Sequence, residues 1–278
     1  MYPVLFQVGP IVVPSYGVMA ALGVLFALAL LLRTARLAGL NPNPLWNLCI
    51  VALFAALVGS RLLLLLLNWS VVRLHPAWLL GLAMVHHPLL AAIGLAFALA
   101  VALPYARTQH LPLRPTVDAL AAPLALALAC EQFGALLSGV GYGTETNLRW
   151  AVVYTSPFAM RWSGAPLFDP VHPVQLYAAC AFLSIALAVF LWMPHSRHSG
   201  DVAGIALLAI ATAIFLTEFF RDREGRGSFF GGILDGPQLA SIAMVLTGAF
   251  FLIERRNPSS SVSPTPALAT IPAEAPHD

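Results

Sequence analysis

Seven long runs of apolar residues, separated by short polar segments, dominate the sequence. Each run has about the 20 residues that an α-helix needs to cross a bilayer. Hydrophobicity is continuous within each run and does not alternate, so the pattern predicts helices and not a membrane barrel. We expect an all-α polytopic membrane protein with about seven transmembrane helices. We place them at residues 12–32, 45–67, 88–105, 118–137, 174–193, 202–220 and 236–253.

The segments between the runs predict a membrane domain over residues 1–256 with one folded loop. Residues 138–173 form the longest connection, and their glycine and aromatic residues predict a small extracytoplasmic cap at the membrane interface. Residues 69–87 carry two tryptophans and several leucines, so we expect them to lie along the membrane surface. The tail, residues 257–278, is rich in Pro, Ser and Ala and is predicted to be disordered.

Composition argues against a soluble domain, a nucleic-acid-binding protein and a lysine-dependent site. The 278 residues are 59% hydrophobic and 9% charged, whereas a soluble domain carries about 25% charged residues. The formal net charge of +2 is too small to indicate a nucleic-acid partner. All 14 basic residues are arginine, so a site that depends on a lysine amine is excluded. The three cysteines lie inside apolar runs without metal-ligand or redox spacing, and neither a metal nor a cofactor is predicted.

Arginines in the connections orient the predicted helices only weakly. With the N-terminus outside, the inner connections carry seven arginines and the outer connections six. We interpret the near balance as a sign that some outer arginines serve a site. Arg221 is the first candidate, because it lies directly after the sixth run.

Polar residues inside the apolar runs are candidate functional residues, because a charge at the centre of a membrane helix costs about 2.5–3.5 kcal/mol. Arg61 lies in the second run. It is either structural, reaching the interface or an ion pair, or it binds a lipid phosphate. Glu131 and Gln132 lie in the fourth run. They either make a helix-packing hydrogen bond with Arg61 or a backbone group, or they take an acid–base role.

Further candidates lie where the runs begin and end. Arg221 closes the sixth run, where it is either an interfacial anchor or a bidentate ligand of a lipid phosphate. We expect its guanidinium to face a headgroup-sized cavity between the helices. His86 and His87 precede the third run and are either an interfacial cap or the source of a base that titrates near neutral pH. His172 starts the fifth run, where a helix N-terminus alone explains it.

Four motifs that are far apart in the sequence belong together by their order and spacing. They are Tyr16-Gly17-Val18-Met19, Gly59-Ser60-Arg61-Leu62, His172-Pro173-Val174-Gln175-Leu176-Tyr177 and Glu218-Phe219-Phe220-Arg221. With these motifs the chain resembles the prolipoprotein diacylglyceryl transferase family. The second, third and fourth are similar to the family's Gly-Ala-Arg, His-Pro-Ser-Gln-Leu-Tyr and Glu-Phe-Phe-Arg. The resemblance covers nearly the whole chain, from Gly9 to Arg256.

The polar signature of that family is altered in this chain. The family has Gly-Arg-x-Gly-Asn-Phe-x-Asn-x-Glu-x-x-Gly, of which Gly134 and Gly143 remain. The arginine, the two asparagines and the glutamate are replaced by Gln132, Ala135, Ser138 and Val140. The histidine motif of the third span is also absent, and His87 takes its place only if that helix shifts by about one turn.

The resemblance implies an enzyme of the bacterial cytoplasmic (inner) membrane that moves a diacylglyceryl group from phosphatidylglycerol to a cysteine thiol of a prolipoprotein. Its partners would be a phosphatidylglycerol-like phospholipid and the prolipoprotein signal peptide. The candidate catalytic residues are Arg221, which would hold the phosphate, and His87 or Glu131 as the base. The candidate lipid- or phosphate-binding residues are Tyr16, Arg61, Gln132, Gly134, Gly143, His172, Gln175 and Tyr177.

The altered signature leaves one alternative open. The chain is then a catalytically silent homologue that serves as a structural or lipid-binding subunit with other membrane proteins. A transporter is disfavoured, because the runs offer too few polar positions for a water-lined pathway.

Overall fold

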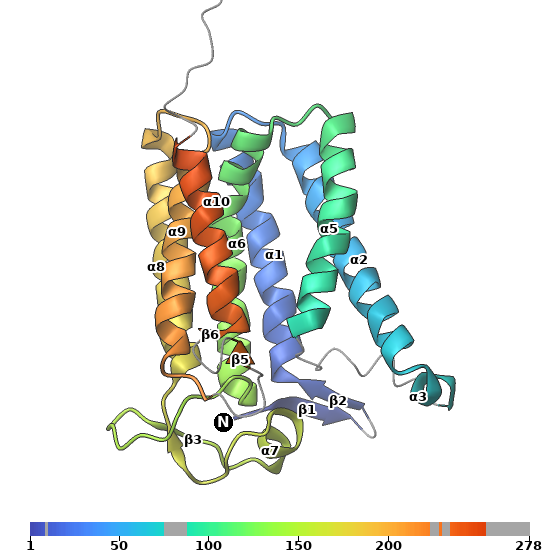
Figure 1. Ribbon diagram of the computed structural model, residues 1–278, viewed down its shortest axis with the longest axis vertical. Coiled ribbons are helices and arrows are strands. Elements are labelled where there is room, and N and C mark those ends of the chain that lie inside the picture. The colour runs from blue at the N-terminus through green and yellow to red at the C-terminus, as the bar shows by residue number, and fades with distance from the viewer. Residues whose placement is uncertain (9–10, 75–87, 223–227, 230–233, 254–278) are drawn as a thin grey trace, which may run out of the picture.

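The computed structural model describes residues 1–8, 11–74, 88–222, 228–229 and 234–253. Within these residues, seven helices are long and apolar enough to cross a membrane, which confirms the predicted fold class. They are α1 (Ser15–Leu37), α2 (Pro42–Leu67), α5 (Pro88–Thr108), α6 (Leu113–Ser138), α8 (Val174–Trp192), α9 (Asp201–Glu218) and α10 (Gly236–Ile253). Figure 1 shows them side by side in one bundle, with the labelled strands and the short helices α3 (Trp69–Leu74) and α7 (Pro157–Ser163) at one end.

Local sequence explains where these helices begin and end. The side chain of Asn41 accepts a hydrogen bond from the backbone N of Asn43 at 3.1 Å, and Pro42 occupies the first turn of α2. α6 ends at Ser138 because Gly139 takes the left-handed conformation, with a φ of 83°. α8 is followed by the single 3-10 turn η2 (Met193–His195) before the chain turns into α9.

The chain begins with a β-hairpin that the sequence analysis did not predict. β1 (Val4–Val8) pairs antiparallel with β2 (Ile11–Pro14), and α1 begins only at Ser15. Residues 12–14 of the first predicted span therefore belong to a strand. The buried Ser15 hydroxyl donates to the carbonyl of Tyr2, and the Ser15 amide donates to the carbonyl of Pro3. These bonds hold the hairpin against the start of α1.

The cap, residues 138–173, contains two short strands and a helix. β3 (Val152–Val153) pairs antiparallel with β4 (Pro170–Val171), and α7 (Pro157–Ser163) lies between them in the sequence. The cap has its own apolar core, made by Tyr154, Ala159, Ala165 and Val171. A core of this kind fixes the positions of the loops that meet the helix ends.

The remaining short elements lie in the connections after α2 and α9. α3 (Trp69–Leu74) starts the segment that was predicted to lie along the membrane surface, and the rest of that segment, residues 75–87, is outside the described residues. β5 (Ser228–Phe229) pairs antiparallel with β6 (Leu234–Asp235) before α10. The tail that was predicted to be disordered, residues 257–278, also lies outside the described residues.

α6 is the helix around which the others pack. It contacts α1, α8 and α9, whereas α2 pairs with α5 and α10 pairs with α9. Small residues on α6 bring its neighbours close, and those that are almost fully buried are Ala119, Ala122, Ala125 and Ala129. α9 and α10 also approach closely, since a Cβ on Gly248 would lie 2.9 Å from the carbonyl oxygen of Gly204.

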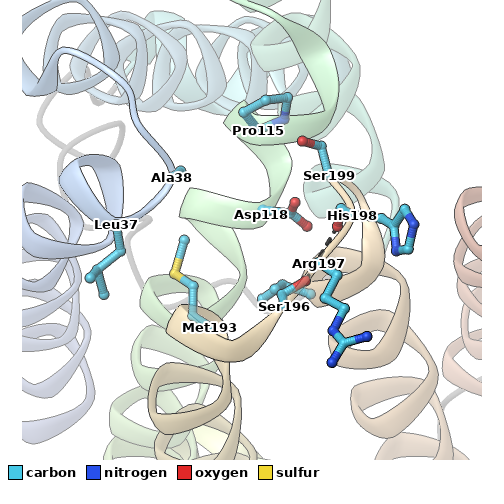
Figure 2. A pocket seen from close by; sticks show the side chains of 10 residues that line it. Leu37, Ala38, Pro115, Asp118, Met193, Ser196, Arg197, His198 and Ser199 are labelled. Atoms are coloured by element: carbon cyan, nitrogen blue, oxygen red, sulfur yellow. Dashed lines mark hydrogen bonds between the residues drawn. The ribbon is translucent and has the colours of Figure 1, made fainter.

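A buried carboxylate joins α6 to α9 at the end of the bundle that lies away from the cap. Asp118 accepts hydrogen bonds from the backbone N of Gly200 at 2.6 Å and of Ala203 at 2.7 Å. Asp118 thus caps α9 from a different helix. Figure 2 shows it beside the turn that carries Ser196 and His198, at a cavity of about 140 Å³.

We expect Asp118→Ala to destabilise the bundle by about 1–3 kcal/mol, because it leaves two buried backbone N–H groups without a partner. Thermal unfolding of the purified protein in detergent measures this change. Asp169→Ala, which removes an exposed carboxylate from the cap, is the matched control and should leave the unfolding temperature nearly unchanged. Equal unfolding temperatures for the two variants would contradict this role of Asp118.

Candidate functional site

The start of α1 meets α6 in a polar cluster inside the bundle. The Tyr16 hydroxyl donates a hydrogen bond to Glu131 Oε1 at 2.9 Å. Gln132 Nε2 donates to Glu131 Oε2 at 2.6 Å. We call these three side chains the Glu131 cluster. Among the described residues, Glu131 bonds Tyr16 and Gln132, so the hydrogen bond proposed for it with Arg61 is absent there.

Gly134 allows the close approach that builds this cluster. A Cβ at this position would lie 2.9 Å from Met19 Cβ and 3.2 Å from the backbone of Tyr16. α1 and α6 can therefore touch only while residue 134 lacks a side chain. The contact places the backbone of Tyr16 beside Gly134, about one turn from Glu131, and the Tyr16 hydroxyl reaches the Glu131 carboxylate from there. Gly134 thus allows close packing of α1 against α6, and its predicted role in lipid or phosphate binding stays a prediction.

Arg221 lies just beyond the end of α9 and forms an ion pair there. Its Nε is 3.3 Å from Glu218 Oε2, and the two side chains are only 15% and 3% exposed. The backbone of Arg221 forms a bridge with Gly143 of the cap, and Thr144 N donates to the carbonyl of Phe220 at 3.0 Å. Arg221 is therefore held from both sides, by its own helix and by the cap.

Gly143 has no space for a side chain at this junction. A Cβ there would lie 2.5 Å from the carbonyl oxygen of His172 and 2.7 Å from Val174 Cγ2. The three chain segments that contain Gly143, His172 and Arg221 consequently pack backbone against backbone. Gly143, like Gly134, positions its neighbours.

Gln175 fastens the cap to the end of α6. It is fully buried, and its Nε2 donates to the carbonyl of Val140 at 2.9 Å and to the Tyr154 hydroxyl at 3.5 Å. The Tyr154 hydroxyl in turn donates to the carbonyl of Leu136 at 3.2 Å. Burial raises the pKa of Tyr154 to about 12, although the hydrogen bond from Gln175 acts in the opposite direction. The observed contacts of Gln175 are thus within the protein.

A cavity of about 370 Å³ opens between α8, α9 and the cap. The rings of His172 and Phe220 lie 5.4 Å apart, and the Tyr177 ring is 6.3 Å from Phe220. Trp150 Nε1 donates to the Tyr177 hydroxyl at 2.8 Å. His172 Nδ1 is buried and has no hydrogen-bond partner among the described residues. The cavity is lined by Leu148, Trp150, His172, Tyr177, Leu216, Thr217 and Phe220.

Some of the predicted site residues line the cavity between α8, α9 and the cap, and others do not. His172 and Tyr177 line the cavity, but Arg221 is not among its lining residues, although Phe220 beside it is. The cavity expected beside the Arg221 guanidinium stays a prediction. Arg61 lies half-buried in α2 and forms no hydrogen bond or ion pair within the described part of the chain. His87 lies outside the described residues.

Trp150 and Thr217 are lining residues that the sequence did not assign to a site. Thr217 looks like any threonine in a membrane helix, so nothing in the sequence marks it. Trp150 had a usable signal, because a tryptophan in an interfacial loop has an apolar ring and one N–H that needs an acceptor. The Tyr177 hydroxyl supplies that acceptor.

Sequence comparisons agree with the resemblance. The model of the family described as prolipoprotein diacylglyceryl transferase matches residues 3–254. A phosphatidylglycerol–prolipoprotein diacylglyceryl transferase of Clostridium tetani is 28% identical over 259 residues, covering 92% of this chain and 98% of the relative. Proteins with the same name from Vibrio cholerae and Mannheimia succiniciproducens are 27% and 28% identical over 90% of this chain, covering 90% and 91% of those relatives.

We expect the cap to lose stability at alkaline pH through Tyr154. The unfolded chain releases this proton near pH 10, whereas the folded chain keeps it until about pH 12. The stabilisation is thus complete below pH 10 and is lost as the pH rises to about 12, amounting to roughly 2–3 kcal/mol. Denaturant unfolding of the wild type and of Tyr154→Phe between pH 9 and 11 measures it. The wild type should lose stability more steeply, and parallel curves would contradict the assignment.

Proposed function

This chain belongs to the prolipoprotein diacylglyceryl transferase family, and we propose that it transfers a diacylglyceryl group from phosphatidylglycerol to a cysteine thiol of a prolipoprotein. The family match over nearly the whole chain is the observation that carries this proposal. Relatives that span the same length carry this activity in their names. Arg221 and the Glu131 cluster, at the cap end of the bundle, support the proposed transfer reaction.

The reaction needs a thiolate and a cation for the leaving phosphate. The cysteine sulfur attacks the glyceryl carbon that carries the phosphate ester, so a C–S bond forms and a C–O bond breaks. Glycerol phosphate leaves with the bonding electron pair, and the thiol proton passes to a base. A thiol is mostly protonated at neutral pH, since its ordinary pKa is about 8.5.

We propose that Arg221 stabilises the phosphate as its charge develops. A guanidinium offers donors in a planar fork that fits a phosphate. The ion pair with Glu218 and the backbone bridge to Gly143 hold this residue before any lipid arrives. Fixed donors of this kind contribute most to catalysis, and the loss of one costs on the order of 10²–10³ in rate.

The remaining predicted residues take supporting roles in this proposal. The thiol proton passes to one of the two predicted bases, Glu131 or His87. The aromatic cavity next to Phe220 supports a lipid-binding role for His172 and Tyr177, because its apolar walls suit an acyl chain. Arg61, which is without an ion pair in the described residues, is available to a second phosphate oxygen.

The chain is a multi-pass membrane protein, and we propose the bacterial cytoplasmic membrane with the cap outside. At the end away from the cap, the acidic residues Asp118 and Asp201 are buried. The exposed charged residues that the structure describes there are all basic, namely Arg33, Arg36, Arg107 and Arg197. The cap, by contrast, exposes Glu145 and Asp169 beside its arginines. Basic residues favour the cytoplasmic side.

Complementation of a bacterium depleted of its own transferase tests the proposal. The wild-type chain should restore growth and lipoprotein modification, because Arg221 holds the phosphate. Arg221→Ala should lower the rate of diacylglyceryl transfer by about 10²–10³ and abolish rescue. Arg149→Ala removes an exposed arginine of the cap and is the matched control, which should rescue fully.

Two outcomes would contradict this proposal. Rescue by Arg221→Ala would remove Arg221 from the reaction. No rescue by a wild-type protein that is present in the membrane at normal abundance would favour a silent homologue. Co-purification with other membrane proteins in mild detergent would then be the next observation for the subunit role.

A further inference from the structure

The cavity of about 370 Å³ between α8, α9 and the cap, called the aromatic cavity below, lies where a lipid chain can reach it. Its lining includes Leu216 from the last turn of α9 and Phe220 just beyond that helix, and both side chains are exposed. Because α9 is apolar and long enough to cross a membrane, its exposed apolar side chains face lipid. An apolar cavity beside them is filled more favourably by an acyl chain than by water.

The same cavity lies next to the residue that we assign to the phosphate of the donor lipid. Phe220 lines the cavity, and Arg221 follows it directly in the chain. In a phospholipid one glycerol joins the phosphate to the acyl chains, so the two parts bind at neighbouring places. Arg221 and the aromatic cavity therefore suit two parts of one molecule.

A hydrogen bond between two lining side chains limits how wide the aromatic cavity can become. Trp150 comes from the cap and Tyr177 from α8, and Trp150 Nε1 donates to the Tyr177 hydroxyl at 2.8 Å. The Tyr177 ring also lies edge-on to the Phe220 ring, with 6.3 Å between the ring centres. Moving the Tyr177 ring away from Trp150 breaks the hydrogen bond, so widening the cavity there costs free energy.

The backbone on both sides of Trp150 is bonded to the strand β4. Thr146 N donates to the carbonyl of Pro170 at 2.9 Å, and Val152 pairs with Val171. The loop that carries Trp150 is thus attached to the cap four residues before the tryptophan and two residues after it. Trp150 consequently forms a wall that is held in place from its backbone and from its indole nitrogen.

We propose that Trp150 is a specificity-determining residue, which selects donor lipids by the width of their acyl chains. A straight chain fits beside the Trp150 and Tyr177 rings, whereas a chain with several methyl branches is wider and has to displace them. Forcing extra methyl groups into a packed site is unfavourable, on a scale that corresponds to about tenfold in rate or affinity. This inference rests on the proposed transferase function and on the acyl-chain role proposed for the cavity.

A transfer assay with two kinds of acyl chain tests the proposal. The purified full-length protein in detergent receives a peptide with an acceptor cysteine and phosphatidylglycerol with either oleoyl chains or methyl-branched phytanoyl chains. The wild type should use the phytanoyl lipid about tenfold more slowly than the oleoyl lipid. Trp150→Ala removes the wall, and it should bring the two rates to within about threefold of each other.

Trp69→Ala is the matched control for the removal of a tryptophan. Trp69 lies in α3, is 58% exposed against 60% for Trp150, and is not among the residues that line the aromatic cavity. This variant should keep the wild-type ratio of the two rates. A ratio that rises as much in Trp69→Ala as in Trp150→Ala would overturn the inference.

Trp150→Phe tests the hydrogen bond with a smaller change in the cap. Phenylalanine keeps an aromatic ring in the wall but has no N–H for the Tyr177 hydroxyl. The wall then yields more easily, so the rate with the phytanoyl lipid relative to the oleoyl lipid should rise by about threefold over the wild type. An unchanged ratio in either folded Trp150 variant would contradict the role of this residue.

The outcomes separate this inference from the proposed function. Equal use of both lipids by the wild type would overturn the inference and leave the transferase function standing. Where neither lipid supports transfer, the transferase function fails, and competition between the two lipids for binding, read by native mass spectrometry, still decides the inference. A wild-type preference for the oleoyl lipid that Trp150→Ala loses then supports it. Equal binding of the two lipids by the wild type, or a preference that Trp150→Ala keeps, overturns it.

Discussion

The contact between α1 and α6 determines how the polar side chains of the Glu131 cluster are arranged. Gly134 lets the two helices touch, and Tyr16 consequently reaches Glu131 from the start of α1. In lipid, helices gain little from burying apolar surface against each other, so close backbone packing and internal hydrogen bonds hold them together. The same contact that stabilises the bundle therefore also fixes the half-buried carboxylate of Glu131.

A second set of contacts, at the end of α9, joins the cap to the membrane helices. Arg221 is paired to Glu218 within its own helix end and bridged to Gly143 in the cap. Gln175 and Tyr154 hold the cap to the end of α6. Because α6 carries both Glu131 and the cap attachment, the charged groups of α6 and α9 are positioned by one connected set of contacts.

The helices could be predicted from the sequence because a membrane demands long apolar segments, and that demand is visible in each run. The β-hairpin before α1 was missed, since Val12 and Val13 continue the apolar run, and Pro14 is tolerated equally at a strand end and before a helix. The cap was predicted as a region, but the pairing of β3 with β4 depends on contacts between distant residues, which local composition does not contain.

The candidate site was predicted in part. The sequence marked Glu131 and Arg221 as polar residues in apolar surroundings, and it marked Tyr16 through a motif of the family that the chain resembles. It could not tell a residue that positions others from one that meets a ligand. Gln175 forms hydrogen bonds with Val140 and Tyr154 inside the protein, and its predicted binding of lipid or phosphate stays a prediction. Such a distinction depends on which neighbour a side chain meets, and this follows only from the packed structure.

Contacts at both ends of α9 affect how the aromatic cavity can change its shape around an occupant. Asp118 holds the first turn of this helix, and the cap holds the residues that follow its end, Phe220 and Arg221. An 18-residue helix anchored at both membrane faces resists swinging outward about either end. Rotation of the Tyr177 and Phe220 rings, which line this cavity, is then a way to enlarge it that leaves the α9 backbone in place.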